Sequence, residues 1–199
     1  QANIPVFWGG ASNLAIELGS EIADIYAIGP ATLADTDALI RRFKAAAATA
    51  GRSPNISMSM RVIVGETEED AWDKAQSVLK AVTSFQSGGK QIGRAKSDAV
   101  LDGVTHSLLA DPADCLDERL WTGITKATEG RLHATALVGT ADQVSDALMQ
   151  YYAIGVDHFL LNGFDTIHDV RLFGKELIPL IRRKVAAIDG TSPEQSKNH

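Results

Sequence analysis

The sequence predicts an α/β fold with a parallel β-sheet, and two observations lead to this prediction. Short apolar runs that suit buried strands alternate with amphipathic stretches that suit helices along most of the 199 residues. The composition, 45% hydrophobic and 22% charged, is that of an ordinary globular domain. Strands that alternate with helices are typical of βαβ units with right-handed connections.

The first βα unit is expected at the start of the chain. Ile4–Trp8 is a continuous apolar run, which favours a strand buried on both faces of a parallel sheet. Gly9 and Gly10 end this run, and Asn13–Gly19 has the spacing of a short helix with Ser12 or Asn13 as N-cap. The pattern predicts a strand, a glycine loop and a helix.

Three more units follow the same pattern. We expect their strands at Ile22–Gly29, Ile56–Val64 and Asp157–Gly163. Glycines, acidic first turns and a Thr140–Gln143 capping box indicate where helices begin and end. The expected helices run from about Pro30 to Gly51, from Glu66–Asp70 onward, from Thr140 to Gly155, and from about Ile167 to Ala187.

One stretch interrupts this regular spacing. Residues 87–133 open with the glycine-rich, basic SGGKQIGRAKSD, which predicts a mobile insertion, since loops of this length are usually lids or disordered. We expect a single domain over residues 1–188 and a disordered tail over 189–199.

Charge and cysteine content exclude several function classes. A net charge of −6 argues against a nucleic-acid partner, because a polyanion selects basic surfaces. The single cysteine, Cys115, cannot form an internal disulfide, and no apolar run reaches the roughly 20 residues that span a bilayer. These features favour a cytoplasmic protein with no membrane partner.

Five segments, in order, resemble the C-terminal half of bacterial-luciferase-like flavin-dependent monooxygenases, in particular their alkanesulfonate monooxygenase branch. The segments are VFWGGASNLAIELGSEIADIYA, MRVIVGETEEDAW, LWTGI, TALVGTADQVSDALMQYYAIGVDHFLLNGFD and GKELIPLIRRKV. The resemblance implies the C-terminal half of a (β/α)8 TIM barrel with a long insertion before the last helix-strand unit. A complete barrel needs about 250 residues, so we expect a homo-oligomer or a missing N-terminal half-barrel.

The same resemblance implies cofactors and partners. Its members bind reduced FMN supplied by a separate flavin reductase, and use O2 to oxygenate a small organic substrate. Related dehydrogenases use F420 instead, so an F420-dependent oxidoreductase is one alternative function. A non-catalytic, truncated half-barrel that only binds flavin or a partner is another.

The glycine loop is the candidate cofactor site, with Gly9, Gly10, Ala11 and Ser12 as its residues. Backbone N–H groups without side chains in the way can approach a phosphate, and the following helix adds its positive end. A tight turn that needs glycine for positive φ explains the same residues. The resemblance favours phosphate, with Ala11 where the family has a first serine.

Arg61 is the candidate catalytic cation on the third strand. A buried cation needs a partner or a polar cavity, so Arg61 either projects into the barrel mouth or pairs with Glu21 or Asp24. By resemblance, Ser59 and Arg61 take the positions of an arginine and a histidine of the alkanesulfonate branch.

The last expected strand supplies the other candidates for the substrate pocket. Phe164 stands where the alkanesulfonate branch has a catalytic tyrosine, and lacking its hydroxyl it can form only an apolar wall. Asn162, at the end of the strand, is either a polar pocket residue or a turn cap.

Arg131 and His133, at the end of the insertion, are the remaining catalytic candidates. They either fold over an anionic ligand or are solvated loop residues. The other histidines and Cys115 lack the spacing of a metal site, so we expect no metal.

Overall fold

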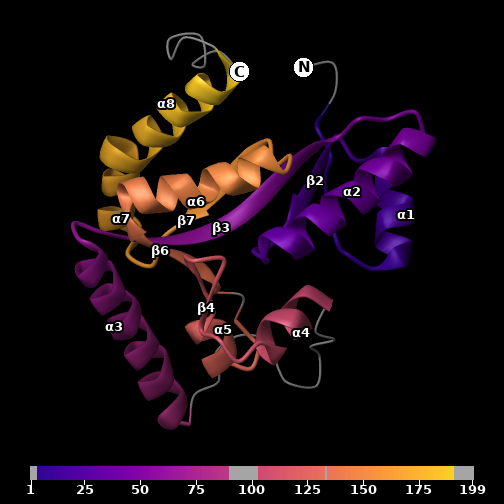
Figure 1. Ribbon diagram of the computed structural model, residues 1–199. Coiled ribbons are helices and arrows are strands. Elements are labelled where there is room, and N and C mark those ends of the chain that lie inside the picture. The colour runs from indigo at the N-terminus through magenta and orange to yellow at the C-terminus, as the bar shows by residue number, and fades with distance from the viewer. Residues whose placement is uncertain (1–3, 90–102, 133, 191–199) are drawn as a thin grey trace.

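The computed structural model describes residues 4–89, 103–132 and 134–190. Five parallel strands, each followed by a helix, form a curved open sheet that corresponds to half of a barrel (Figure 1). Four of these units are the expected ones: β1 (Phe7–Gly9) with α1 (Asn13–Ile22), β2 (Ile25–Ile28) with α2 (Leu33–Thr49), β3 (Asn55–Gly65) with α3 (Glu68–Ser87), and β7 (His158–Asn162) with α7 (Thr166–Leu172). A fifth strand, β6 (Ala136–Thr140), precedes the helix expected from Thr140 and was not among the expected strands. The predicted α/β half-barrel is therefore present.

β3 organises the sheet because it is the longest of the described strands and carries the largest number of buried residues. Along its 11 residues it pairs with β2 through 55–58, with β7 through 57–61 and with β6 (Ala136–Thr140) through 61–65, each time in parallel. Met58 and Met60 are fully buried and belong to the main hydrophobic core. This core lies between the sheet and the helices α2, α6 (Ala141–Ala153) and α8 (Ile178–Asp189) (Figure 1).

Local signals explain most helix boundaries. Ser12, Thr32 and Thr67 are the N-caps of α1, α2 and α3, and each accepts a hydrogen bond from the backbone three residues later. The capping box expected at Thr140–Gln143 is present at the start of α6. The expected last helix contains a π-helical turn, Phe173–Leu177, which separates α7 from α8.

Two expectations about the chain need correction. The first strand was expected to be buried on both faces, but Phe7 is 61% exposed, because β1 pairs only with β2 among the described residues. The insertion expected as a loop at 87–133 contains regular structure in its described part, because its apolar residues form a second small core around Trp121 and Ile124. Its elements are α4 (Gly103–Ala110), β4 (Cys115–Leu116), β5 (Leu120–Trp121) and α5 (Gly123–Ala127).

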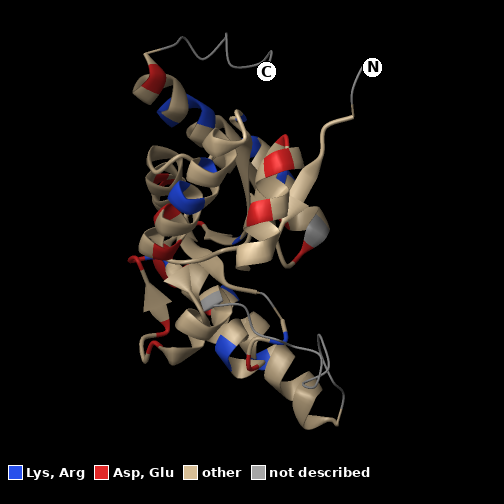
Figure 2. Ribbon diagram, turned by 90° about the vertical axis from the view of Figure 1, so that its right-hand side faces the viewer, with Lys and Arg blue, Asp and Glu red and all other residues tan. Residues whose placement is uncertain are grey.

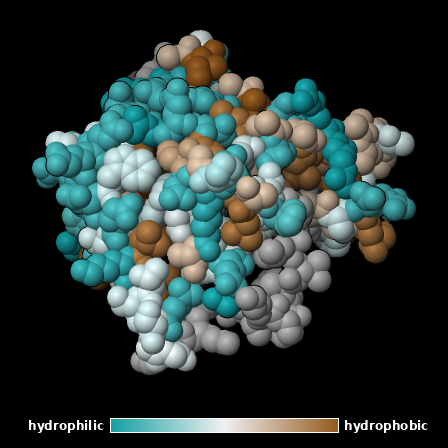
Figure 3. All heavy atoms as spheres, turned by 60° about the horizontal axis from the view of Figure 1, so that its bottom comes forward, coloured by the Kyte–Doolittle hydropathy of each residue, from teal (hydrophilic) through white to brown (hydrophobic). Residues whose placement is uncertain are grey.

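The mobility of that insertion and the disorder of the tail stay predictions, and residues 90–102 and 191–199 lie outside the described part of the chain. Lys and Arg are interspersed with Asp and Glu over the helices, with several basic residues on α8 (Figure 2). Separate apolar patches interrupt a largely hydrophilic surface on the face drawn in Figure 3. None of the described helices is both long and apolar enough to cross a bilayer.

Candidate functional site

The glycine loop follows β1 at the carboxyl end of the sheet. Gly10 has φ of +120°, and a Cβ added there would lie 2.9 Å from the Cβ of Ala15. Both facts exclude a side chain at this position. The loop therefore needs glycine for its own geometry, as the tight-turn interpretation expected, and it also leaves its backbone accessible.

Hydrogen bonds hold this loop in place from several sides. Tyr26, on β2, donates its hydroxyl to the carbonyl oxygen of Gly10 at 2.7 Å. Trp8 donates its indole N–H to the carbonyl of Ala15 at 2.8 Å, and Ser12 Oγ accepts the N–H of Ala15 at 3.1 Å. Ser12 is exposed, so its hydroxyl hydrogen stays available to a ligand.

The positive end of α1 lies beside this loop. Within the described residues, the backbone N–H groups of Ala11, Asn13 and Leu14 have no acceptor. Free N–H groups at the start of a helix of ten residues attract an anion. The loop residues predicted for the cofactor thus present donors rather than acceptors.

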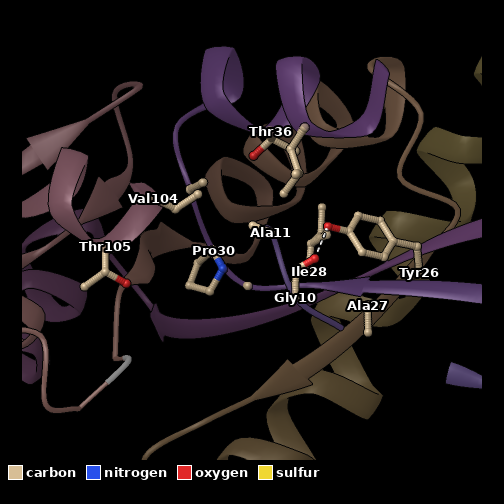
Figure 4. A pocket seen from close by; sticks show the side chains of 12 residues that line it. Gly10, Ala11, Tyr26, Ala27, Ile28, Pro30, Thr36, Val104 and Thr105 are labelled. Atoms are coloured by element: carbon tan, nitrogen blue, oxygen red, sulfur yellow. Dashed lines mark hydrogen bonds between the residues drawn. The ribbon is translucent and has the colours of Figure 1, made fainter. Parts of the chain in front are cut away.

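A small cavity adjoins the loop. It has a volume of about 130 Å³ and lies between the carboxyl ends of β1 and β2, the start of α2 and the insertion helix α4 (Figure 4). Its lining includes Gly10, Ala11, Tyr26, Thr36, Val104 and Thr105.

Burial raises the pKa of Tyr26 to about 12, and the nearby Arg42 guanidinium opposes that rise. Tyr26 is therefore a neutral donor at ordinary pH.

Arg61 and its neighbours form a second group, where the middle of β3 pairs with the carboxyl end of β7. The Arg61 guanidinium donates to the carbonyl of Gly163 at 3.1 Å and lies 5.1 Å from the ring centroid of Phe164. Asn162 donates to Ser59 Oγ at 3.3 Å across the same strand pair. The structure thus brings together Arg61, Ser59, Asn162 and Phe164, which the sequence singled out separately.

The expected alternative for Arg61, an ion pair with Glu21 or Asp24, is wrong. Asp24 pairs with Arg52 at 3.0 Å, and the backbone N–H of Val6 donates to its other oxygen. Arg61 is compensated instead by a carbonyl and an aromatic face, which stabilises a cation by cation–π attraction.

The turn after β7 is fixed by one carboxylate. Asp169 Oδ2 accepts the backbone N–H groups of Phe164 and Asp165 at 2.7 and 2.8 Å. A cavity of about 370 Å³ lies next to this turn, between Phe164, the end of β3 and the helices α3 and α7.

The other candidates are not brought into these groups. Arg131 follows α5 and lies 3.9 Å from Glu129, and no described contact links it to Arg61 or to the glycine loop. His133 lies outside the described residues. Their catalytic role stays a prediction.

Sequence reasoning missed two residues of α2 beside the loop, Arg42 and Thr36. Arg42 donates to Asn13 Oδ1 at 2.8 Å and to the carbonyl of Ala11 at 3.3 Å. Nothing in a helix sequence marks which exposed cation will reach a loop 30 residues earlier.

The sequence model of the luciferase-like monooxygenases matches residues 1–158. This chain belongs to that family. It is 33% identical over 179 residues to a sulfoquinovose monooxygenase of Novosphingobium aromaticivorans, which covers 88% of this chain and 48% of that protein. It is 31% identical over 184 residues to a sulfoquinovose monooxygenase of Agrobacterium fabrum, which covers 89% of this chain and 46% of that protein. The chain spans about half the length of these curated relatives.

Solved structures show the same fold. DmoA from Hyphomicrobium sulfonivorans matches with a TM-score of 0.65 and 23% identity, over 89% of this chain and 41% of that one. Riboflavin lyase RcaE, solved with modified FMN and riboflavin, matches with a TM-score of 0.62 and 19% identity, over 89% and 42%. The F420-dependent tetrahydromethanopterin reductase of Methanopyrus kandleri matches with 0.55 and 17%, over 88% and 50%. The luciferase-like half-barrel predicted from the sequence is thereby confirmed.

Proposed function

We propose that this chain forms the flavin-binding half of a two-component monooxygenase that uses reduced FMN and O2 to oxygenate a small organic sulfonate. The observation that carries the proposal is the donor-rich glycine loop, at the same end of the sheet as a cation on an aromatic wall. The family and the two relatives named as sulfoquinovose monooxygenases support the reaction class.

Gly9, Gly10, Ala11 and Ser12 would hold the FMN phosphate. Their fit to this group follows from the absent side chain at Gly10 and the free N–H groups at the start of α1. When bound, reduced FMN would supply two electrons to O2, so that one oxygen atom enters the substrate and the other leaves as water. A separate flavin reductase would deliver the reduced cofactor.

Arg61 would bind the sulfonate. A guanidinium has five N–H donors, and Arg61 uses one of them, toward Gly163. Phe164 would form an apolar wall that holds the guanidinium in place and excludes water. Ser59 and Asn162, already hydrogen-bonded to each other, would present polar atoms on the same side.

The substrate pocket would be completed by further βα units. The outer edges of β1 and β7 have no strand partner among the described residues, and Phe7 and Leu160 on them are 61% and 60% exposed. Open parallel edges with exposed apolar residues favour association. We propose that an N-terminal half-barrel, or a second copy of the chain, covers both edges in a cytoplasmic enzyme.

The experiment is a titration of the chain with reduced FMN and, separately, with reduced F420 under anaerobic conditions. Saturable binding of FMN alone supports the proposal, whereas preference for F420 favours an F420-dependent oxidoreductase. Sulfite release from alkanesulfonates and sulfoquinovose, with a flavin reductase and the completing half present, tests turnover. Flavin binding without any turnover would favour the non-catalytic alternative.

A further inference from the structure

The hydroxyl of Thr36 is buried without a partner. Thr36 lies in the first turns of α2 and is 1% exposed, and its Oγ1 makes no hydrogen bond within the described part of the chain. A threonine hydroxyl in a helix usually bonds a carbonyl three or four residues earlier. Thr49 and Thr83 do so here, at 3.2 and 3.0 Å. The free hydroxyl of Thr36 is therefore an exception within its own chain.

The Thr36 side chain lines the cavity beside the glycine loop. In Figure 4 it lies between α2 and the segment that carries Gly10 and Ala11, with Val104 of the insertion helix on the other side. A cavity of about 130 Å³ has room for a small polar group but not for a flavin ring system. An unpaired buried hydroxyl that lines such a space points to a ligand atom as its missing partner.

The surroundings favour an anion. Arg42 has no carboxylate partner among the described residues, and its charge opposes the rise in the pKa of Tyr26, whose hydroxyl is bonded to Gly10. Asp35 lines an adjoining hollow with Arg42, but its carboxylate already accepts hydrogen bonds from Thr32 Oγ1 at 2.9 Å and Ser107 Oγ at 3.3 Å. Donors from a helix start, a hydroxyl and a guanidinium suit a phosphate.

We infer that Thr36 is a ligand of the flavin phosphate. The phosphate would then lie between the glycine loop and α2, with its oxygens on the free N–H group of Ala11 and on Thr36 Oγ1, and with Arg42 as the flanking cation. The inference rests on the proposed function, and adds that α2 makes the site selective for FMN over riboflavin, which lacks the phosphate.

The test compares Thr36→Val with Thr49→Val on the same helix, by titration with FMN and with riboflavin followed by flavin fluorescence. Thr36→Val keeps the shape and removes the hydroxyl. We expect its dissociation constant for FMN to rise about tenfold, as for one hydrogen bond to a charged group, and that for riboflavin to stay within about twofold. Thr49→Val should bind both flavins as the parent chain does.

The thermal stability of the Thr36→Val variant shows whether Thr36 contacts the phosphate or only supports the fold. Because Thr36→Val removes an unpaired polar group from the interior, the thermal midpoint of the free chain should stay equal or rise. Thr36→Ser, which restores a hydroxyl, should recover most of the FMN affinity.

Several results would overturn the inference. Unchanged FMN affinity in Thr36→Val, or equal weakening of FMN and riboflavin, would mean that Thr36 does not contact the phosphate. If the parent chain binds FMN and riboflavin equally well, the inference about the phosphate is wrong, but the proposal that the chain binds a flavin still holds. If the parent chain binds neither flavin, the proposed function itself is contradicted.

Discussion

The glycine loop and the Arg61 group lie at the same end of the half-barrel, but their polar atoms are satisfied differently. In the Arg61 group each side chain has a partner from the protein, since Arg61 bonds Gly163 and Asn162 bonds Ser59, and only further guanidinium donors of Arg61 are left over. Around the glycine loop several N–H groups and the Thr36 hydroxyl have no partner in the described part of the chain. The N–H groups belong to exposed or half-buried residues and are open to a ligand, whereas the Thr36 hydroxyl is buried, and an unpaired buried donor is rare in folded proteins. This difference supports the loop as the proposed site of the ligand.

The difference also assigns separate tasks to the two groups. The loop is enclosed by α2 and the insertion helix α4, which suits the fixed end of a cofactor. Phe164 of the Arg61 group lines a larger cavity of about 370 Å³, together with residues of β3, α3 and α7. Mutations in one group should therefore leave the other's ligand largely unaffected.

The largest effect is expected for Gly10→Val. Its positive φ and the contact at 2.9 Å with Ala15 leave no room for a side chain. The free energy of unfolding should fall by about 1–3 kcal/mol, and FMN affinity by at least about tenfold. Urea unfolding and FMN titration measure the two effects.

Gly174→Ala is the control for that variant, because a Cβ at Gly174 meets no atom within 4 Å. It should leave both quantities nearly unchanged. Normal FMN binding by Gly10→Val would contradict a role for the loop in phosphate binding.

Arg61→Met tests the second group. It keeps an apolar side chain over Phe164 but removes the cation, so the KM for a sulfonate should rise about tenfold or more in the completed enzyme. FMN affinity should stay within about twofold. Steady-state sulfite release measures the KM, and an unchanged KM would exclude Arg61 from the substrate site.

Ser12→Ala and Ser12→Asp separate helix capping from phosphate binding. Loss of the N-cap in Ser12→Ala should lower the free energy of unfolding by about 0.5–2 kcal/mol. Aspartate keeps the capping oxygen but adds a negative charge, so Ser12→Asp should unfold like the parent and yet bind FMN worse than Ser12→Ala. Equal FMN affinities of the two variants would place the phosphate elsewhere.

The smallest effect concerns Tyr26. Its folded-state pKa of about 12 exceeds the unfolded value near 10, so its stabilisation is fully present below pH 10 and is lost as the pH rises toward 12. Tyr26→Phe keeps the stacking on Phe43 and removes the bond to Gly10, at a cost of about 1 kcal/mol. Urea unfolding between pH 8 and 11 should show a shallower fall for Tyr26→Phe than for the parent chain. Parallel curves would contradict the raised pKa.

Much of the fold was predictable from the sequence because its signals are local. Apolar runs, caps such as Thr140 and glycines such as Gly51 and Gly155 fix strands and helix ends within a few residues. The exposure of β1 was not predictable, because the same apolar run is found in strands that a neighbouring strand covers and in strands that none covers. The structure within the insertion was missed because it depends on tertiary burial of residues such as Trp121 and Ile124.

The candidate site was predictable where residue type alone is informative. Two glycines between a strand and a helix drew attention to the loop, and an arginine on a buried strand drew attention to Arg61. Thr36 was missed because its importance lies in a hydrogen bond that it does not make. The association of Arg61 with Phe164 depends on the pairing of β3 with β7, which joins residues 103 positions apart.

A crystal structure of the chain with FMN would test the central claim most directly. We expect the phosphate between the glycine loop and α2, with its oxygens within hydrogen-bond distance of the N–H group of Ala11 and of Thr36 Oγ1. A phosphate bound at Arg61, with the cavity beside Thr36 occupied only by water, would contradict it.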